Sequence, residues 1–214
     1  MKALIILYLS IISLNAICQN QDNYDLLIAS GGIPFSSFYE INNEGNNNRT
    51  DSFYYYNDWQ KADLYLKSKM ITLPCRFNIQ RGLLEVKWNK NNLVLTSKNI
   101  DSVLFKEANT VFVYEQMLRS LVQVVVNGEF KLLKEFTLKT NKADYNPSLN
   151  IGNKYDSYSV IYQYYIKHNN SVCLISNRKS IKGCLSNIGF SRNDFKKIRM
   201  NEASLKELTQ QLNN

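Results

Sequence analysis

The fold is decided by residues 60–88, which read QKADLYLKSKMITLPCRFNIQRGLLEVKW. Apolar side chains recur here at every second position, at Leu64 and Leu66 and again from Ile71 to Phe77. A period of two is typical of a strand with one buried face, and the breaks between the alternating runs are too short for helices. We therefore expect these strands to pair antiparallel, because a parallel crossover needs about a dozen residues or more.

The same alternation continues through Leu93–Thr96, Ile100–Phe105 and Thr110–Tyr114. Closely spaced strands of this kind predict an antiparallel β meander, built as a curled sheet or an open barrel. Pro74 cannot donate a hydrogen bond to a neighbouring strand. We expect its strand to lie at an edge of the sheet or beside a bulge.

Two hairpins are expected after the meander. In the first, Asn127-Gly128 marks the turn. Matching the apolar faces favours a three-residue loop with a left-handed Gly128, in which Val124 lies opposite Phe130.

The second hairpin has four apolar or aromatic side chains on one face of its first strand, at Val160, Tyr162, Tyr164 and Ile166. Residues 168–170 form its turn, and Val172–Ile175 form the returning strand. His168, the single histidine of the chain, is expected to be exposed at the tip of this turn.

Three short helices are expected to complete the chain. Apolar residues at helical spacing from Ile181 to Ile188, followed by Gly189, predict the first. Ser191 is a candidate cap for the second, and Asn201 for the third. Strands followed by helices predict an α+β fold.

The N-terminus has the form of a secretory signal peptide. Lys2 precedes the uncharged apolar run 3–14, and cleavage is expected after Cys18. The alternative, a lipoprotein anchored through Cys18, is disfavoured because Asn15 and Ile17 do not fit the required pattern. No later stretch approaches the roughly 20 apolar residues of a membrane span, so we expect no transmembrane segment in the mature chain.

These patterns divide the chain into four parts. They are a signal peptide (1–18), an N-terminal extension (19–57) with an Asn-rich loop at 41–51, an antiparallel β domain (58–175), and a helical segment packing on the sheet (176–214).

Removal of the signal peptide leaves Cys75, Cys173 and Cys184. Export permits disulfides, and an odd number of cysteines allows at most one internal bridge. Because Cys75 and Cys184 occupy apolar positions, we expect them to be small buried side chains.

Composition excludes several kinds of chemistry. With one histidine, the chain cannot form a zinc site from two or three histidines. We expect no catalytic residue, metal site or cofactor. The 26 Lys and Arg residues exceed the 18 Asp and Glu residues, which permits contact with anionic surfaces. The favoured explanation of the excess of lysine is codon bias in an A/T-rich genome, with the lysines as solvated surface residues.

Aromatic residues suggest a ligand platform at 53–59, for which the candidate residues are Tyr54, Tyr56 and Trp59. The alternative is that alternate rings enter the core. A second tyrosine-rich run, with the same two interpretations, contains Tyr155, Tyr158, Tyr162, Tyr164 and Tyr165.

A basic C-terminal face is the other candidate site. It would contain Lys196, Lys197 and Arg199, next to further basic residues from Arg178 onward. The alternative is a solvated helix face. Asp58 and Asp63, considered as paired carboxylates, resemble ordinary surface charge.

Three short stretches carry a resemblance: Ala62–Leu66, Leu73–Asn78 and Leu83–Val86. Together with Tyr164–Lys167 and Lys179-Ser180, they resemble a family of uncharacterised, exported, β-rich proteins of Gram-negative bacteria. The resemblance implies export and a β-rich body, and it supplies no catalytic residue.

The sequence thus predicts an exported envelope protein, periplasmic or secreted, that acts as a non-enzymatic binding or structural module. Its expected partner is an envelope protein, a glycan or an anionic surface, and its oligomeric state is left open. One alternative is binding of an anionic polymer, such as lipopolysaccharide or the less favoured nucleic acid, through the basic helices. The other is a hydrolase of unrecognised type.

Overall fold

Strands form where the alternation predicts them. The computed structural model describes residues 38–40, 54–66, 69–88, 91–95, 99–186 and 198–214. Strands β2 (Gln60–Leu66), β3 (Lys69–Asn78) and β4 (Leu83–Trp88) pair antiparallel in sequence order. Their inward-facing side chains are buried, among them Leu64, Leu66, Cys75, Phe77, Leu84 and Val86.

The described strands form one antiparallel sheet of eleven strands, in the order β1-β5-β4-β3-β2-β6-β7-β8-β9-β10-β11. The remaining strands are β1 (Phe38–Glu40), β5 (Asn91–Leu95), β6 (Ser102–Phe105), β7 (Thr110–Glu115), β8 (Ser120–Val126), β9 (Phe130–Asn141), β10 (Ser157–His168) and β11 (Ser171–Ile175). Because β1 and β11 do not pair with each other, the sheet is open. This confirms the predicted β-rich α+β class.

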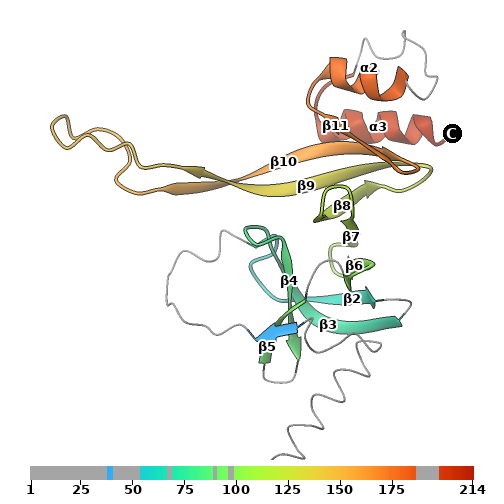
Figure 1. Ribbon diagram of the computed structural model, residues 1–214, viewed down its shortest axis with the longest axis horizontal. Coiled ribbons are helices and arrows are strands. Elements are labelled where there is room, and N and C mark those ends of the chain that lie inside the picture. The colour runs from blue at the N-terminus through green and yellow to red at the C-terminus, as the bar shows by residue number, and fades with distance from the viewer. Residues whose placement is uncertain (1–37, 41–53, 67–68, 89–90, 96–98, 187–197) are drawn as a thin grey trace, which may run out of the picture.

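The simple meander is wrong at one point, because β6 pairs with β2 instead of β5. Residues 96–101, which separate β5 from β6, reach at most roughly 24 Å when extended. β5 and β6 run in the same direction, and three strands lie between them. In a flat sheet, so short a segment could not reach from the end of β5 to the start of β6. The sheet therefore curls, and Figure 1 shows β2 and β3 running across β4 and β5. Phe77, Phe105 and Phe112 fill the curl.

Helices α2 (Arg178–Ser186) and α3 (Glu202–Leu212) cover one face of the sheet at β8 to β11 (Figure 1). Ile181 and Leu205 of the helices pack with Leu132 and Ile166 of the strands. The described residues thus contain two helices where three were expected. The predicted helix beginning at Ser191 falls in 187–197, outside the described residues, as do the signal peptide and the Asn-rich loop.

One disulfide, Cys173–Cys184, joins β11 to α2. Cys184 is therefore bonded, where a simple buried side chain was expected. Cys75 is a buried free thiol, as predicted, and its burial raises its pKa.

The β8–β9 hairpin corrects the predicted register. Val124 lies opposite Leu133, the bulge falls between Val124 and Val126, and Gly128 is not left-handed. The bulge turns Val125 and Val126 alike toward the helical layer. The predicted register compared only the two strands of the hairpin. It therefore took no account of packing against the helices.

The β10–β11 hairpin has the predicted strands, but its turn is tighter than expected. His168 pairs with Ser171, so Asn169 and Asn170 form the turn. The imidazole stacks on Phe130 with 4.3 Å between ring centroids and is partly buried, which corrects its predicted exposure. Pro74 lies in the part of β3 that pairs with β2 but not with β4, and this part is locally an edge.

Candidate binding surface

The aromatic candidates Tyr54 and Trp59 stack on basic side chains of the chain itself. The Arg76 guanidinium carbon lies 3.6 Å from the Tyr54 ring centroid and 4.7 Å from that of Trp59. Arg76 donates to the buried Glu85 at 2.8 Å, and Tyr54 donates to the same carboxylate at 3.1 Å. Burial is the main cause that raises the pKa of Tyr54, and the negative charge of Glu85 raises it further. These rings thus pack on a partly buried ion pair between Arg76 and Glu85.

Tyr56 lies against the core. Its ring meets Phe105 edge-on at 5.2 Å, and its hydroxyl donates to Thr110 at 3.3 Å. Of the basic candidates, Arg199 is exposed near the start of α3, whereas Lys196 and Lys197 fall outside the described residues. Ligand binding by any of these six residues stays a prediction.

Buried carboxylates in the described residues are neutralised by partners. Asp63, expected at the surface, is buried, accepts from Thr72 at 2.5 Å and lies 2.9 Å from the Lys106 ammonium. The hydrogen bonds from Thr72 and Lys106 lower the pKa of Asp63. A lowered pKa favours the ionised form of Asp63, which suits the anchoring of strands better than general acid catalysis.

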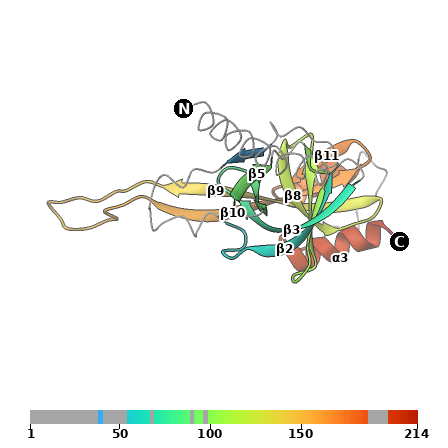
Figure 2. The same ribbon diagram turned by 90° about the horizontal axis from the view of Figure 1, so that it is seen from below.

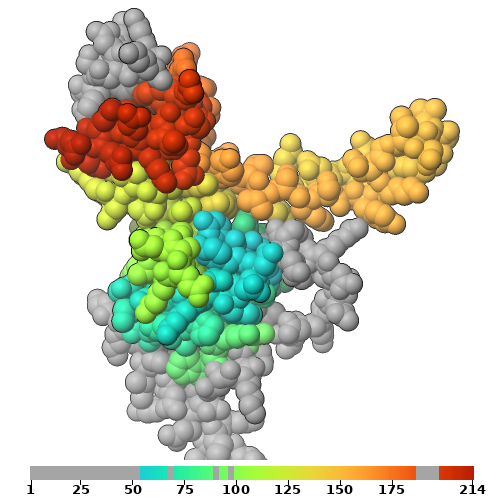
Figure 3. All heavy atoms as spheres, turned by 180° about the vertical axis from the view of Figure 1, so that it is seen from behind, coloured from blue at the N-terminus to red at the C-terminus, as the bar shows by residue number. Residues whose placement is uncertain are grey.

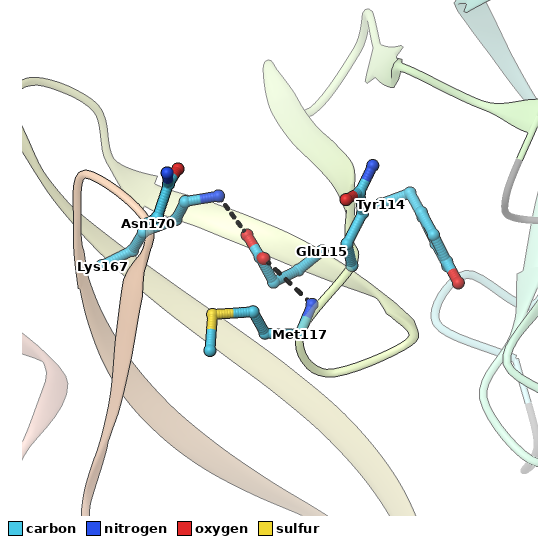
Figure 4. A pocket seen from close by; sticks show the side chains of 6 residues that line it. Tyr114, Glu115, Met117, Lys167 and Asn170 are labelled. Carbon is cyan, nitrogen blue, oxygen red and sulfur yellow. Dashed lines mark hydrogen bonds and ion pairs between the residues drawn. The ribbon is translucent and has the colours of Figure 1, made fainter.

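A cavity of about 410 Å³ lies between the β7–β8 and β10–β11 turns (Figure 4). Its wall contains the buried Glu115, whose carboxylate lies 2.6 Å from Lys167 Nζ and accepts from the Met117 backbone N–H at 3.3 Å. Glu115 and Lys167 therefore form an ion pair with each other in the wall of the cavity. The other lining residues are Tyr114, Gln116 and Asn170. Across the described ranges, no three metal-ligating side chains cluster.

The most distinctive surface is a β-ribbon that projects from the body. Strands β9 and β10 pair over twelve residues each, but β8 pairs only with Leu132–Lys134 and β11 only with Tyr164–His168. The outer ribbon and its loop, residues 136–162, we call the arm. Figures 1 and 2 show the arm extending well beyond the sheet, and in Figure 3 it is a narrow yellow and orange projection.

The arm exposes apolar side chains on both of its faces. Val160 is 39% exposed and Tyr162 56% exposed on one face of β10, and Ile161 is 40% exposed on the other. Leu149 and Ile151 near the tip are more exposed still. A concentration of exposed apolar groups on one element marks an interaction surface more often than an incidental feature.

Polar contacts fix the base of the arm to the helical layer. Lys134 of β9 lies 2.8 Å from Glu202 of α3 and 4.5 Å from the Tyr162 ring centroid. Tyr164 donates to the same Glu202 carboxylate at 2.7 Å. Burial raises the pKa of Glu202, but the hydrogen bonds from Lys134, Tyr164 and Lys206 outweigh it and lower the pKa to about 2.

On the opposite face of the sheet, Glu135 accepts hydrogen bonds from Ser120 and Tyr165, each at 2.7 Å. The base is thereby held on both faces. The arm thus projects from a part of the sheet that polar contacts hold on both faces.

The sequence contained part of the signal for this surface. The alternation of Val160, Tyr162, Tyr164 and Ile166 predicts their common face, which β10 has. Ile166 is buried under the helices and Val160 is exposed on the arm, although both belong to the same pattern. Periodicity predicts which side chains share one face of a strand. It does not show how far along the strand that face is covered by other elements.

Comparison of the chain with protein-family models, curated proteins and solved structures finds no match. The resemblance to exported β-rich proteins therefore stays a prediction. Neither α2 nor α3, nor any other helical segment in the described ranges, is long and apolar enough to cross a membrane.

Proposed function

We propose that the protein is an exported, non-enzymatic binding module of the cell envelope, periplasmic or secreted, and that the arm is the element that binds a partner protein. The observation that carries the proposal is the exposure of Val160, Ile161 and Tyr162 on a ribbon that stands away from the body.

An isolated two-stranded ribbon is only marginally stable in water, whereas three or more strands with a covered apolar face are stable. The arm has six paired positions, and no layer of the described residues covers its outer end. A partner that adds a strand or covers a face would remove this apolar surface from water, at roughly 25 cal/mol per Å² buried.

Two further observations support export and binding. Residues 1–18 have the pattern of a signal peptide, and the Cys173–Cys184 disulfide suits an oxidising compartment. The buried carboxylates Asp63, Glu85 and Glu115 are each held by a basic side chain, as in a structural framework.

Photocrosslinking in the cells that produce the protein tests the role of the arm. A photoreactive benzoylphenylalanine replaces Tyr162 on the arm or, as the control, Met70, which is 54% exposed on the body. We expect a discrete protein adduct from position 162 and none from position 70. Equal crosslinking at both positions, or none at 162, would overturn the proposal.

Export is tested separately by intact-mass measurement of the protein from the cell envelope and the medium. We expect a chain beginning at Gln19. A full-length product confined to the cytosol would refute export, and a lipid adduct on Cys18 would replace the free form with an anchored one.

A further inference from the structure

In the part of the chain that the structure describes, one side of β10 has no neighbouring strand along its outer half. β10 pairs with β9 over its whole length and with β11 from Tyr164 onward. Over residues 157–163, no strand of the described residues pairs on the β11 side. Natural sheets protect such edges with charged side chains, prolines or bulges.

This edge carries none of those protections. From Ser157 to Ile166 the strand reads SYSVIYQYYI, with no charged residue and no proline, and its register with β9 is unbroken. The nearest charges along the chain, Asp156 and Lys167, lie outside this stretch. An exposed, uncharged, regular edge is a template for pairing with another strand.

The absence of charge favours a second copy of the same strand. In an antiparallel pair related by a two-fold axis, each residue of one copy faces the residue of the other copy that lies equally far from the axis on the opposite side. Such a symmetric contact uses the same surface of both copies. A charged residue near the axis would face its own copy or a near neighbour, and like charges placed opposite each other destabilise a sheet. This strand has no such residue.

We infer that two copies of the chain associate through their arms, with β10 of one copy pairing antiparallel with β10 of the other and the two-fold axis at Val160. This rests on the proposed role of the arm and names its partner. Val160 is the midpoint of 157–163, the length of edge left by β11. The two ribbons then form one sheet of four strands.

The side chains fit this register. Val160 faces its own copy, and Ile161 faces Ser159 of the second copy on the other side of the sheet. Tyr162 lies diagonal to the second Val160, within the reach of an aromatic ring. Each pair combines uncharged side chains, and Val160, Ile161 and Tyr162 each lose exposed surface.

Cysteine crosslinking tests the register. Val160→Cys places two thiols directly opposite at the axis, where mild oxidation should join most of the protein into a disulfide-linked dimer. Thr137→Cys is the matched control. Thr137 lies on β9, where it pairs with Ile161, so the two Thr137 residues of the dimer are two strand spacings farther apart than the two Val160 residues. Crosslinking of Thr137→Cys as efficient as that of Val160→Cys would overturn the register.

Light scattering on the purified exported protein tests the association without crosslinks. We expect the mass of a dimer for the wild type and for Leu149→Lys, an equally drastic change at the exposed tip. We expect a monomer mass for Val160→Lys, which sets two ammonium groups face to face. A monomeric wild type at all concentrations would overturn the inference.

The photocrosslink at position 162 separates the two ideas. An adduct of twice the mass of the chain supports both. An adduct with a different protein, together with a monomeric wild type, would leave the arm a binding element and refute self-pairing. No adduct would refute both.

Discussion

At the scale of single residues, Glu202 fastens the helical layer to the base of the arm. Its carboxylate receives Lys134 and Tyr164 from the sheet and Lys206 from its own helix. Because these contacts lower the pKa of Glu202 to about 2 from its ordinary value of 4.5, the folded state prefers the ionised form. The stabilisation is therefore present above pH 4.5 and is lost as the pH falls toward 2.

Glu202→Gln should accordingly lower the free energy of unfolding at pH 7 by about 1 kcal/mol, a modest value because the side chain is partly exposed. Urea unfolding at a series of pH values measures this. The difference from wild type should shrink between pH 4.5 and pH 2. Glu207→Gln, an exposed change on the same helix, should have little effect at any pH. A loss for Glu202→Gln that is independent of pH would contradict this assignment.

The Glu115–Lys167 pair gives a second prediction at this scale. Lys167→Met leaves the carboxylate of the buried Glu115 without its counter-charge, and should cost about 2–3 kcal/mol in unfolding free energy. Glu115→Gln added to Lys167→Met removes the buried charge and should recover part of the loss. Chemical denaturation of the two single variants and the double variant measures the coupling. Losses that simply add would show that the pair contributes nothing as a pair.

Single residues were predictable from the sequence where the signal is local. Asn201 caps α3 as predicted, its side chain accepting from the Ser204 N–H at 2.9 Å. The partner of Cys184 was not predictable, because it depends on how β11 meets α2. Tyr54 and Trp59 were recognisable as a ring pair, but Arg76, which stacks between them and Glu85, is distant in the sequence.

At the scale of elements, the C-terminus of α3 is tied to the start of β9 by Asn213. Its side-chain oxygen accepts from the Phe130 N–H at 2.8 Å, and its amide donates to the Phe130 carbonyl at 2.9 Å. A Cβ at Gly128 would lie 2.5 Å from this amide. Gly128 is thus required for a close approach and does not serve a left-handed turn.

Gly128→Ala should therefore destabilise the protein by about 1 kcal/mol by displacing Asn213, and Asn213→Ala by about 1–2 kcal/mol. Because both changes break the same tie, the double variant should be little worse than Asn213→Ala alone. Thermal unfolding of the three variants measures this. Gly183→Ala is the matched control, since open space surrounds Gly183 in α2 and alanine there should stabilise the helix. Additive losses at 128 and 213 would refute the tie.

Strand positions were predictable because alternation is a local property, and β2, β3, β4 and β10 formed where it occurs. The register of the β8–β9 hairpin was not, because the bulge is set by Val125 and Val126 packing toward the helices. Local patterns thus gave the elements, and contacts with distant elements decided their alignment.

At the scale of the whole molecule, a curled sheet holds the main core, and an open-edged ribbon extends from it. The crossing from β5 to β6 could not be predicted, because it follows from the closure of the curl and leaves no residue signature. The arm could not be predicted from the sequence either, since its tyrosines and valines follow the same alternating pattern as those of the covered strands. Its exposure follows from where the pairing with β8 and β11 ends, and no local pattern in the sequence gives those limits.

Hydrogen–deuterium exchange on the exported protein tests the central claim most directly, by following the β10 peptide 157–163 over a range of protein concentrations. If β10 pairs with its own copy, deuterium uptake in this peptide should be slow in concentrated solution and rise on dilution, while uptake in the β2 peptide 60–66 stays constant. Val160→Lys should exchange fast at every concentration. Uptake in 157–163 that does not change with concentration in the wild type would contradict the pairing of the arms.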